Sequence, residues 1–154
     1  MAKDFDKALR YAFLLLKYRA RSKKEINDRL KRKGYSSSLI DKVIEYLQEY
    51  NYLNDEEFAR MFVSSSVEKG WGQRRIKFEF KKFGVEPKIY ERFLATRAFK
   101  DKKKEKINQL IERKMKFYKG KKNSTQKVIR FLLGKGFEYD EIFKALDQLG
   151  VKKF

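Results

Sequence analysis

One short pattern occurs three times along the chain, over residues 22–35, 72–85 and 124–137. Each copy begins with Ser or Gly, which suits the N-cap of a helix, and ends with a Gly followed at once by a bulky apolar residue. Such an ending is typical of a Schellman motif, in which the Gly is left-handed and the next residue packs back on the last helical turn. The closing glycines are Gly34, Gly84 and Gly136. The pattern therefore predicts a fold built from three copies of one unit.

The apolar residues follow helical periodicity, and no segment alternates as a strand would. Helices are predicted over residues 6–18, 23–33, 37–50, 55–69, 73–83, 87–99, 101–119, 125–135 and 140–149. A unit of about 50 residues buries little apolar surface alone, so neighbouring units must share cores. We therefore expect an all-α fold of three tandem three-helix repeats, spanning 1–53, 54–99 and 100–154, in an elongated, curved array.

The charge balance limits the partners of this chain. It has 40 Lys and Arg against 21 Asp and Glu, a formal net charge of +19, which indicates a polyanionic ligand. Nucleic acid is favoured over a membrane, because the longest apolar run covers only residues 12–16 and residues 1–6 lack a signal core. The chain has no Cys and no His, so we expect no metal and no cofactor. A soluble, cytoplasmic protein is expected.

Cations stand at the predicted starts of the second helix of each repeat, where the helix dipole disfavours them. Next to free backbone N–H groups, such cations make a phosphate site. We expect the three starts to line one track, although a Lys-rich chain also clusters cations by chance. Reversing Arg74 and Arg75 to Glu should then weaken binding without lowering thermal stability. With the very basic segment 100–122, the candidate polyanion-binding residues are Lys24, Arg74, Arg75, Lys103, Lys104, Lys121 and Lys122.

Two aromatic residues are candidate contacts. Trp71 lies between two glycines and before Arg74, so its ring is placed either to stack on an unpaired base or to pack over a helix junction. Phe78 lies off the apolar face of its helix, which suits either a protein contact or packing against the next repeat. The acidic residues around Asp55 lack the spacing of a calcium loop, and helix capping explains them better.

Several motifs resemble the RecX family, bacterial regulators of the RecA recombinase. They are Tyr52-Leu53-Asn54-Asp55-Glu56-Glu57-Phe58-Ala59, then Gly70-Trp71-Gly72, and then Arg75-Ile76 with Glu79. Ser66 stands where the family usually has Arg, and Gln73 where Pro is common. The resemblance implies an architectural role for the residues that match the family pattern, which are Asp55, Phe58, Ala59, Gly72, Ile76 and Gly84.

The resemblance also implies a function. RecX-like proteins are non-enzymatic, lie in the groove of the RecA filament on single-stranded DNA, and inhibit its ATPase and strand exchange. The expected partners are therefore the RecA filament and single-stranded DNA, with duplex DNA left open, and the roles are DNA recombination, repair and the SOS response. We expect a monomer.

Two other functions stay open. A general or helix-turn-helix DNA-binding protein acting without RecA would also be basic and helical, and it would prefer one duplex site. A nuclease would need several convergent carboxylates, which the predicted apolar faces do not provide.

Overall fold

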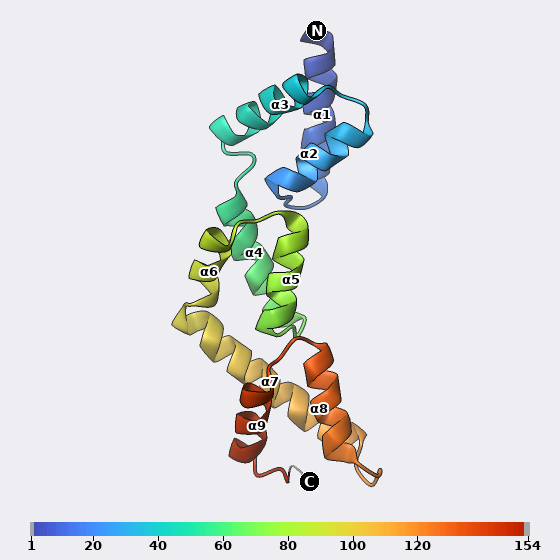
Figure 1. Ribbon diagram of the computed structural model, residues 1–154, viewed down its shortest axis with the longest axis vertical. Helices are drawn as coiled ribbons and strands as arrows, with labels where there is room; N and C mark the ends of the chain where they lie inside the picture. Colours follow the sequence, from blue (N-terminus) through green and yellow to red (C-terminus); the bar gives the residue numbers. More distant parts are fainter. Residues whose placement is uncertain (1, 153–154) are drawn as a thin grey trace. The chain divides into compact units, whose positions relative to one another are not determined.

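The computed structural model describes residues 2–152, and in this range it contains nine helices and no strand (Figure 1). The all-α prediction is confirmed. The helices are α1 (Ala2–Tyr18), α2 (Lys23–Arg32), α3 (Ser37–Glu49), α4 (Asp55–Glu68), α5 (Gln73–Phe83), α6 (Pro87–Leu94), α7 (Arg97–Phe117), α8 (Ser124–Gly134) and α9 (Tyr139–Gln148).

The chain divides into two compact units. The first comprises the chain up to Met61 together with Phe80–Tyr90, and the second comprises Phe62–Glu79 together with the chain from Glu91 onward. Three helices, α4, α5 and α6, therefore each contribute residues to both units. Each unit is described on its own below.

The first unit has a core formed by one face of each of α1, α2 and α3. Ala8 and Ala12 are fully buried, and their small side chains let the backbone of α1 approach its neighbours closely. The i, i+4 spacing of Ile26 and Leu30 places both side chains on the buried face of α2. The remaining buried members are Leu15, Ile40, Val43, Ile44, Leu47 and Leu53.

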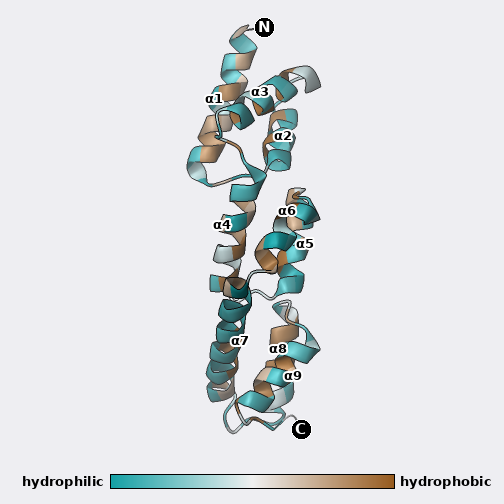
Figure 2. Ribbon diagram, turned by 90° about the vertical axis from the view of Figure 1, so that its left-hand side faces the viewer, coloured by the Kyte–Doolittle hydropathy of each residue, from teal (hydrophilic) through white to brown (hydrophobic). Residues whose placement is uncertain are grey.

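The second unit has an equivalent core between α7, α8 and α9. Ile107, Leu110 and Ile111 supply the buried face of α7, and most of the rest of that long helix is hydrophilic (Figure 2). The other helices and the loop between them contribute Val128, Leu132, Phe137, Ile142, Ala145 and Leu146.

All three predicted Schellman endings are present. Gly34, Gly84 and Gly136 have φ values of +92°, +69° and +97°. In each, the N–H of the following apolar residue donates to a carbonyl in the last helical turn, at 3.3 Å for Tyr35 to Leu30, 3.1 Å for Val85 to Phe80 and 3.1 Å for Phe137 to Leu132. The predicted ends of α2, α5 and α8 are therefore confirmed.

Two predicted boundaries are wrong. Residues 87–99 do not form one helix, because α6 ends at Leu94 and α7 begins at Arg97. Thr96 is the N-cap of α7: its Oγ1 accepts the N–H of Phe99 at 3.1 Å and donates to the carbonyl of Phe93 at 3.0 Å. The N-cap of α8 is Asn123, not Ser124, and its side chain makes no capping bond.

Candidate nucleic-acid interface

The start of α2 is joined to the end of α5 within the first unit. Ser22 caps α2, and its Oγ donates to the carbonyl of Phe83 at 2.7 Å. The N–H of Lys23 donates to Asp55 Oδ1 at 2.8 Å, and Lys24 Nζ donates to the carbonyl of Lys82 at 3.3 Å. We call this set of contacts the first junction.

The start of α5 is joined to the end of α8 within the second unit, here through backbone N–H groups as well as a side chain. The N–H groups of Gly72 and Arg74 donate to the carbonyls of Lys135 and Gly136, at 2.8 and 3.1 Å. Arg74 Nη2 donates to the carbonyl of Leu133 at 2.5 Å, and Arg74 Nη1 lies 3.7 Å from Glu138 Oε1. We call this set the second junction.

These junctions limit the premise that the N–H groups at the helix starts are free for phosphate. A helix exposes unpaired N–H groups at its start and unpaired carbonyls at its end, and each junction pairs some of both, including the N–H groups of Lys23 in α2 and Arg74 in α5. Lys24 places its positive charge at the carbonyl end of α5, and Arg74 places its charge at the carbonyl end of α8. The helix dipole favours a positive charge at that end. The cations that the sequence marks as unfavourable at one helix start are thus favourable at the end of another.

The third start differs. The residue of α8 that matches Lys24 and Arg74 in the repeat is Gln126, and the first N–H groups of α8 have no hydrogen-bond acceptor among the described residues. Thr125 Oγ1 donates to the carbonyl of Lys152 at 2.9 Å. Of the three starts, that of α8 therefore has the fewest paired N–H groups among the described residues.

Replacing Arg74 with Gln is expected to lower the free energy of unfolding by about 1 kcal/mol. The variant loses the hydrogen bond to Leu133 and the contact with Glu138, and the estimate is modest because the Arg74 side chain is 52% exposed. Chemical denaturation would measure the change. For Arg74, this replaces the sequence-based expectation of unchanged stability.

Arg130→Gln is the matched control for this prediction. Arg130 is exposed on α8 and forms no ion pair with any described residue. If both variants lose the same stability, Arg74 does not hold the second junction.

Trp71 packs inside the second unit. The guanidinium of Arg75 lies 4.1 Å from the centroid of its ring, Lys69 Nζ lies 5.1 Å from it, and Phe62 meets it edge-on at 6.1 Å. Arg75 also packs its Cβ against Gly136 at the second junction. These contacts match the packing interpretation, and base stacking by Trp71 stays a prediction.

The remaining candidate residues differ in exposure and in their contacts within the protein. Lys103 is 19% exposed, pairs with Glu141 at 3.3 Å and lies over the ring of Phe99, whereas Lys104 is exposed. Phe78 is also exposed, and it has a contact within the protein. The family-motif residues Phe58, Ala59 and Ile76 are buried.

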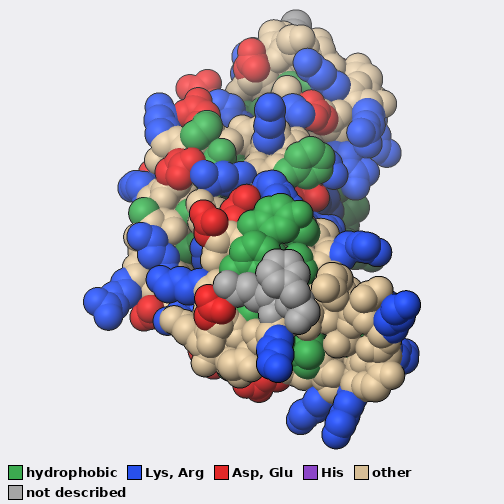
Figure 3. Space-filling view, turned by 60° about the horizontal axis from the view of Figure 1, so that its bottom comes forward, with side chains coloured by type: hydrophobic (Ala, Val, Ile, Leu, Met, Phe, Trp, Pro, Cys, Tyr) green, Lys and Arg blue, Asp and Glu red, His purple; other side chains and the backbone are tan. Residues whose placement is uncertain are grey.

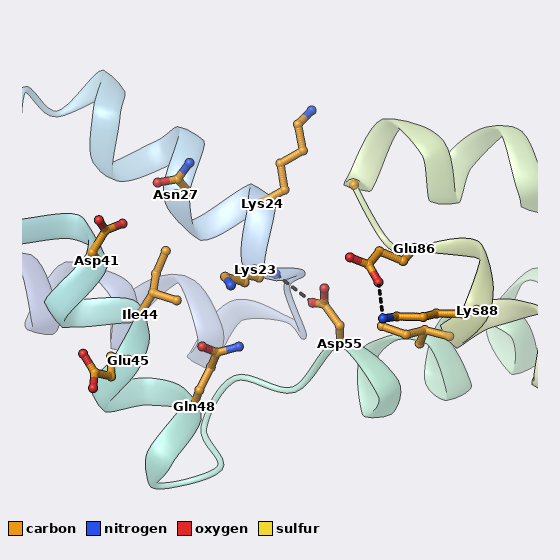
Figure 4. Close-up of a pocket in the computed structure, with 12 residues that line it drawn as sticks. Lys23, Lys24, Asn27, Asp41, Ile44, Glu45, Gln48, Asp55, Glu86 and Lys88 are labelled. Carbon is orange, nitrogen blue, oxygen red and sulfur yellow. Dashed lines mark hydrogen bonds and ion pairs between the residues drawn. The ribbon is translucent and has the colours of Figure 1, made fainter. Parts of the chain in front are cut away.

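Asp55 lies in a cleft of about 820 Å³ in the first unit (Figure 4). Burial raises the pKa of its carboxyl group, although the N–H of Lys23 opposes that shift. The cleft mixes acidic and basic side chains, among them a Lys88–Glu86 ion pair at 3.2 Å. No group of three acidic side chains in the described part of the chain is arranged to hold a metal ion.

The connection between α7 and α8 contains a cluster that sequence reasoning recognised only in part. Lys121 was a candidate, but its neighbours Lys114, Phe117 and Tyr118 were not. Phe117 ends α7, is 62% exposed and meets Tyr118 edge-on at 5.0 Å. Phe117 follows Lys114 by three residues and Leu110 by seven, so it continues the same helical stripe, and its exposure gave no signal in the sequence.

The same region carries an unbalanced charge. Residues 113–137, which we call the acid-free segment, contain no Asp or Glu, and their cations are Arg113, Lys114, Lys116, Lys119, Lys121, Lys122, Lys127, Arg130 and Lys135. None of these cations pairs with a carboxylate in residues 2–152. Lys and Arg side chains project outward at many places on the face shown in Figure 3.

None of the helices described is both long and apolar enough to cross a bilayer.

Comparison with known proteins finds three family models along the chain. They are described as the first, second and third three-helix domains of RecX, and they match residues 8–47, 54–94 and 101–146. The Regulatory protein RecX of Caldanaerobacter subterraneus subsp. tengcongensis is 36% identical over 144 residues, covering 94% of this chain and 71% of that protein. The Bacillus subtilis Regulatory protein RecX is also 36% identical, over 96% of this chain but only 55% of its own length.

Solved structures show the same fold. The crystal structure of RecX from Lactobacillus salivarius has a TM-score of 0.82 and 28% identity, covering 97% of this chain and 99% of that one. A second crystal structure of a regulatory protein RecX has a TM-score of 0.82 at 19% identity, covering 95% of this chain and 74% of that one, and supports the fold alone.

Proposed function

Because the chain belongs to the RecX family of regulatory proteins, we propose that it regulates RecA by binding the RecA filament on single-stranded DNA. In this proposal it inhibits ATP hydrolysis and strand exchange, acts as a monomer and catalyses no reaction itself. Its roles are then in DNA recombination, repair and the SOS response, inside the cytoplasm.

The observation that carries the proposal is the match of all three RecX domains along one chain. The charge supports it, since a net charge of +19 suits a partner that is itself anionic. The acid-free segment adds cations that form no ion pair with a carboxylate in residues 2–152.

The cations available to the filament are those that no junction uses. Lys104, Lys121 and Lys122 are exposed, and we propose them as the main contacts. Lys24 and Arg74 hold helix ends, so we propose that they contribute mainly through their charge. We propose weaker contacts with the filament for four other residues, which are Arg75, Lys103, Trp71 and Phe78.

Titrating this protein into a RecA filament on single-stranded DNA is expected to reduce the rate of ATP hydrolysis in a saturable way. The double reversal Lys121→Glu and Lys122→Glu should inhibit more weakly, because it places two negative charges where the filament would meet cations. Steady-state ATP turnover at rising protein concentration provides the measurement.

The matched control is Lys3→Glu with Lys7→Glu, which changes the net charge equally at exposed positions of α1. It should inhibit nearly as well as the unaltered protein. Unchanged ATP turnover at saturating protein would refute the proposed function. Tight binding to DNA in that case would support a DNA-binding protein that acts without RecA.

A further inference from the structure

We propose that Phe117 is a stacking platform for one base of a single-stranded nucleic acid, with lysines beside it to hold the adjoining phosphates. We call Lys114, Phe117, Tyr118 and Lys121 the aromatic tip. This inference rests on the proposed contact with single-stranded DNA, and it can be tested without RecA.

The aromatic tip combines an exposed ring with two ammonium groups that lie over it. Phe117 is 62% exposed although it is a large apolar side chain, and it lies where α7 ends. Lys121 Nζ lies 4.6 Å from the centroid of its ring, and Lys114 Nζ lies 5.3 Å from it. A planar base laid on this ring would displace an ammonium group from over it and bring the adjoining phosphates within reach of the two lysines.

Among residues 2–152 these lysines have aromatic rings as neighbours and form no ion pair. Lys114 also lies 4.3 Å from the centroid of the Phe131 ring, and Lys121 and Lys127 lie 5.7 and 5.6 Å from that of Tyr118. At exposed sites a cation over a ring is a weak contact, and a phosphate oxygen is a much stronger partner for an ammonium group. Neither Lys114 nor Lys121 forms an ion pair with a carboxylate in residues 2–152.

The start of α8 lies in the same connection and adds donors. The backbone of Asn123 is in the left-handed conformation, with φ +59°, and its side chain makes no capping hydrogen bond. The first N–H groups of α8 have no hydrogen-bond acceptor within residues 2–152. Unpaired N–H groups at a helix start favour an anion. They supplement the aromatic tip, which carries the inference.

The combination of an open ring with cations favours a single strand over other polyanions. In a duplex the bases are stacked on each other and cannot lie on a protein ring, whereas each base of a single strand offers a free face. An anionic membrane could also attract lysines and accept a phenylalanine, and the test below separates that outcome.

Phe117→Ala is expected to weaken binding to a fluorescent oligo(dT) roughly tenfold, the usual range for losing one base–ring stack. Phe117→Trp should bind at least as well as the unaltered protein. Binding to a duplex of equal length should change less than about twofold, because the electrostatic contacts to phosphate remain. Anisotropy titrations at fixed salt would measure all three.

Tyr139→Ala is the matched control. Tyr139 is 55% exposed in the same unit, but it lies among Glu138, Asp140 and Glu141. Its removal should leave oligo(dT) binding unchanged. Thermal melting would verify that each variant is folded.

A direct readout uses Phe117→Trp together with Trp71→Phe, which leaves one tryptophan in the chain. Its fluorescence should be quenched by oligo(dT), and much less by the duplex. Absence of quenching, or unchanged oligo(dT) binding by Phe117→Ala, would overturn the inference. So would equal losses for single strand and duplex, or a loss of binding only to phosphatidylserine vesicles.

The two proposals fail separately. Unchanged oligo(dT) binding by Phe117→Ala, with ATP turnover still inhibited, would refute the stacking platform alone. If Phe117→Ala loses oligo(dT) binding but the unaltered protein does not change RecA ATP turnover, the proposed function is refuted and the stacking platform is not.

Discussion

Replacing Gly72 with alanine is expected to lower the free energy of unfolding by about 3 kcal/mol, combining overpacking with loss of junction hydrogen bonds. A Cβ at this position would lie 2.3 Å from the carbonyl carbon of Gly136 and 2.4 Å from its oxygen. Backbone atoms cannot rotate away as a side chain can. The start of α5 would have to move, and the second junction would lose its bonds from Gly72 and Arg74. Denaturant unfolding would measure the change.

Gly34→Ala is the control for this effect. Gly34 has φ +92°, but a Cβ there would meet nothing within 4 Å, so only the backbone conformation is strained. The cost of that strain is about 1–2 kcal/mol. If Gly72→Ala is no more destabilising than Gly34→Ala, the close approach at the second junction does not contribute to stability as described.

Affinity for single-stranded DNA is expected to fall by roughly 300-fold between 50 and 200 mM salt. The physical cause is counterion release, because about 0.7 ions leave a single strand for each phosphate neutralised. With about six phosphate contacts, the logarithm of the binding constant falls against the logarithm of the salt concentration with a slope near −4. Fluorescence anisotropy over a salt series would give the slope. A nearly flat dependence would contradict an electrostatic interface.

A triple variant identifies where the slope arises. Lys119→Gln, Lys121→Gln and Lys122→Gln together should reduce the slope by about 2, because each removes one phosphate contact. The same change at Lys3, Lys7 and Lys17, which are exposed on α1, should reduce it much less. Equal reductions would mean that the whole surface attracts DNA and that the acid-free segment has no special role.

Some helix boundaries depend only on neighbouring residues in the sequence, and others do not. The Schellman endings at Gly34, Gly84 and Gly136 could be predicted because each requires only a Gly and the apolar residue that follows it. The break between α6 and α7 could not, because the apolar periodicity continues through Thr96 and Phe99, and a Thr can stand inside a helix or cap one. The capping bond of Thr96 decided between the two.

The helices and their repeat could be predicted from the sequence, since they depend on residues within a few turns of one another, and the excess of positive charge follows from composition. What the cations contact depends on the folded arrangement of the chain. Arg74 meets a carbonyl 59 residues away in the chain, Lys24 one 58 residues away, and both roles would otherwise have been assigned to phosphate. Helix propensity and capping act within one turn, whereas a helix end binds whichever chain segment folding brings to it.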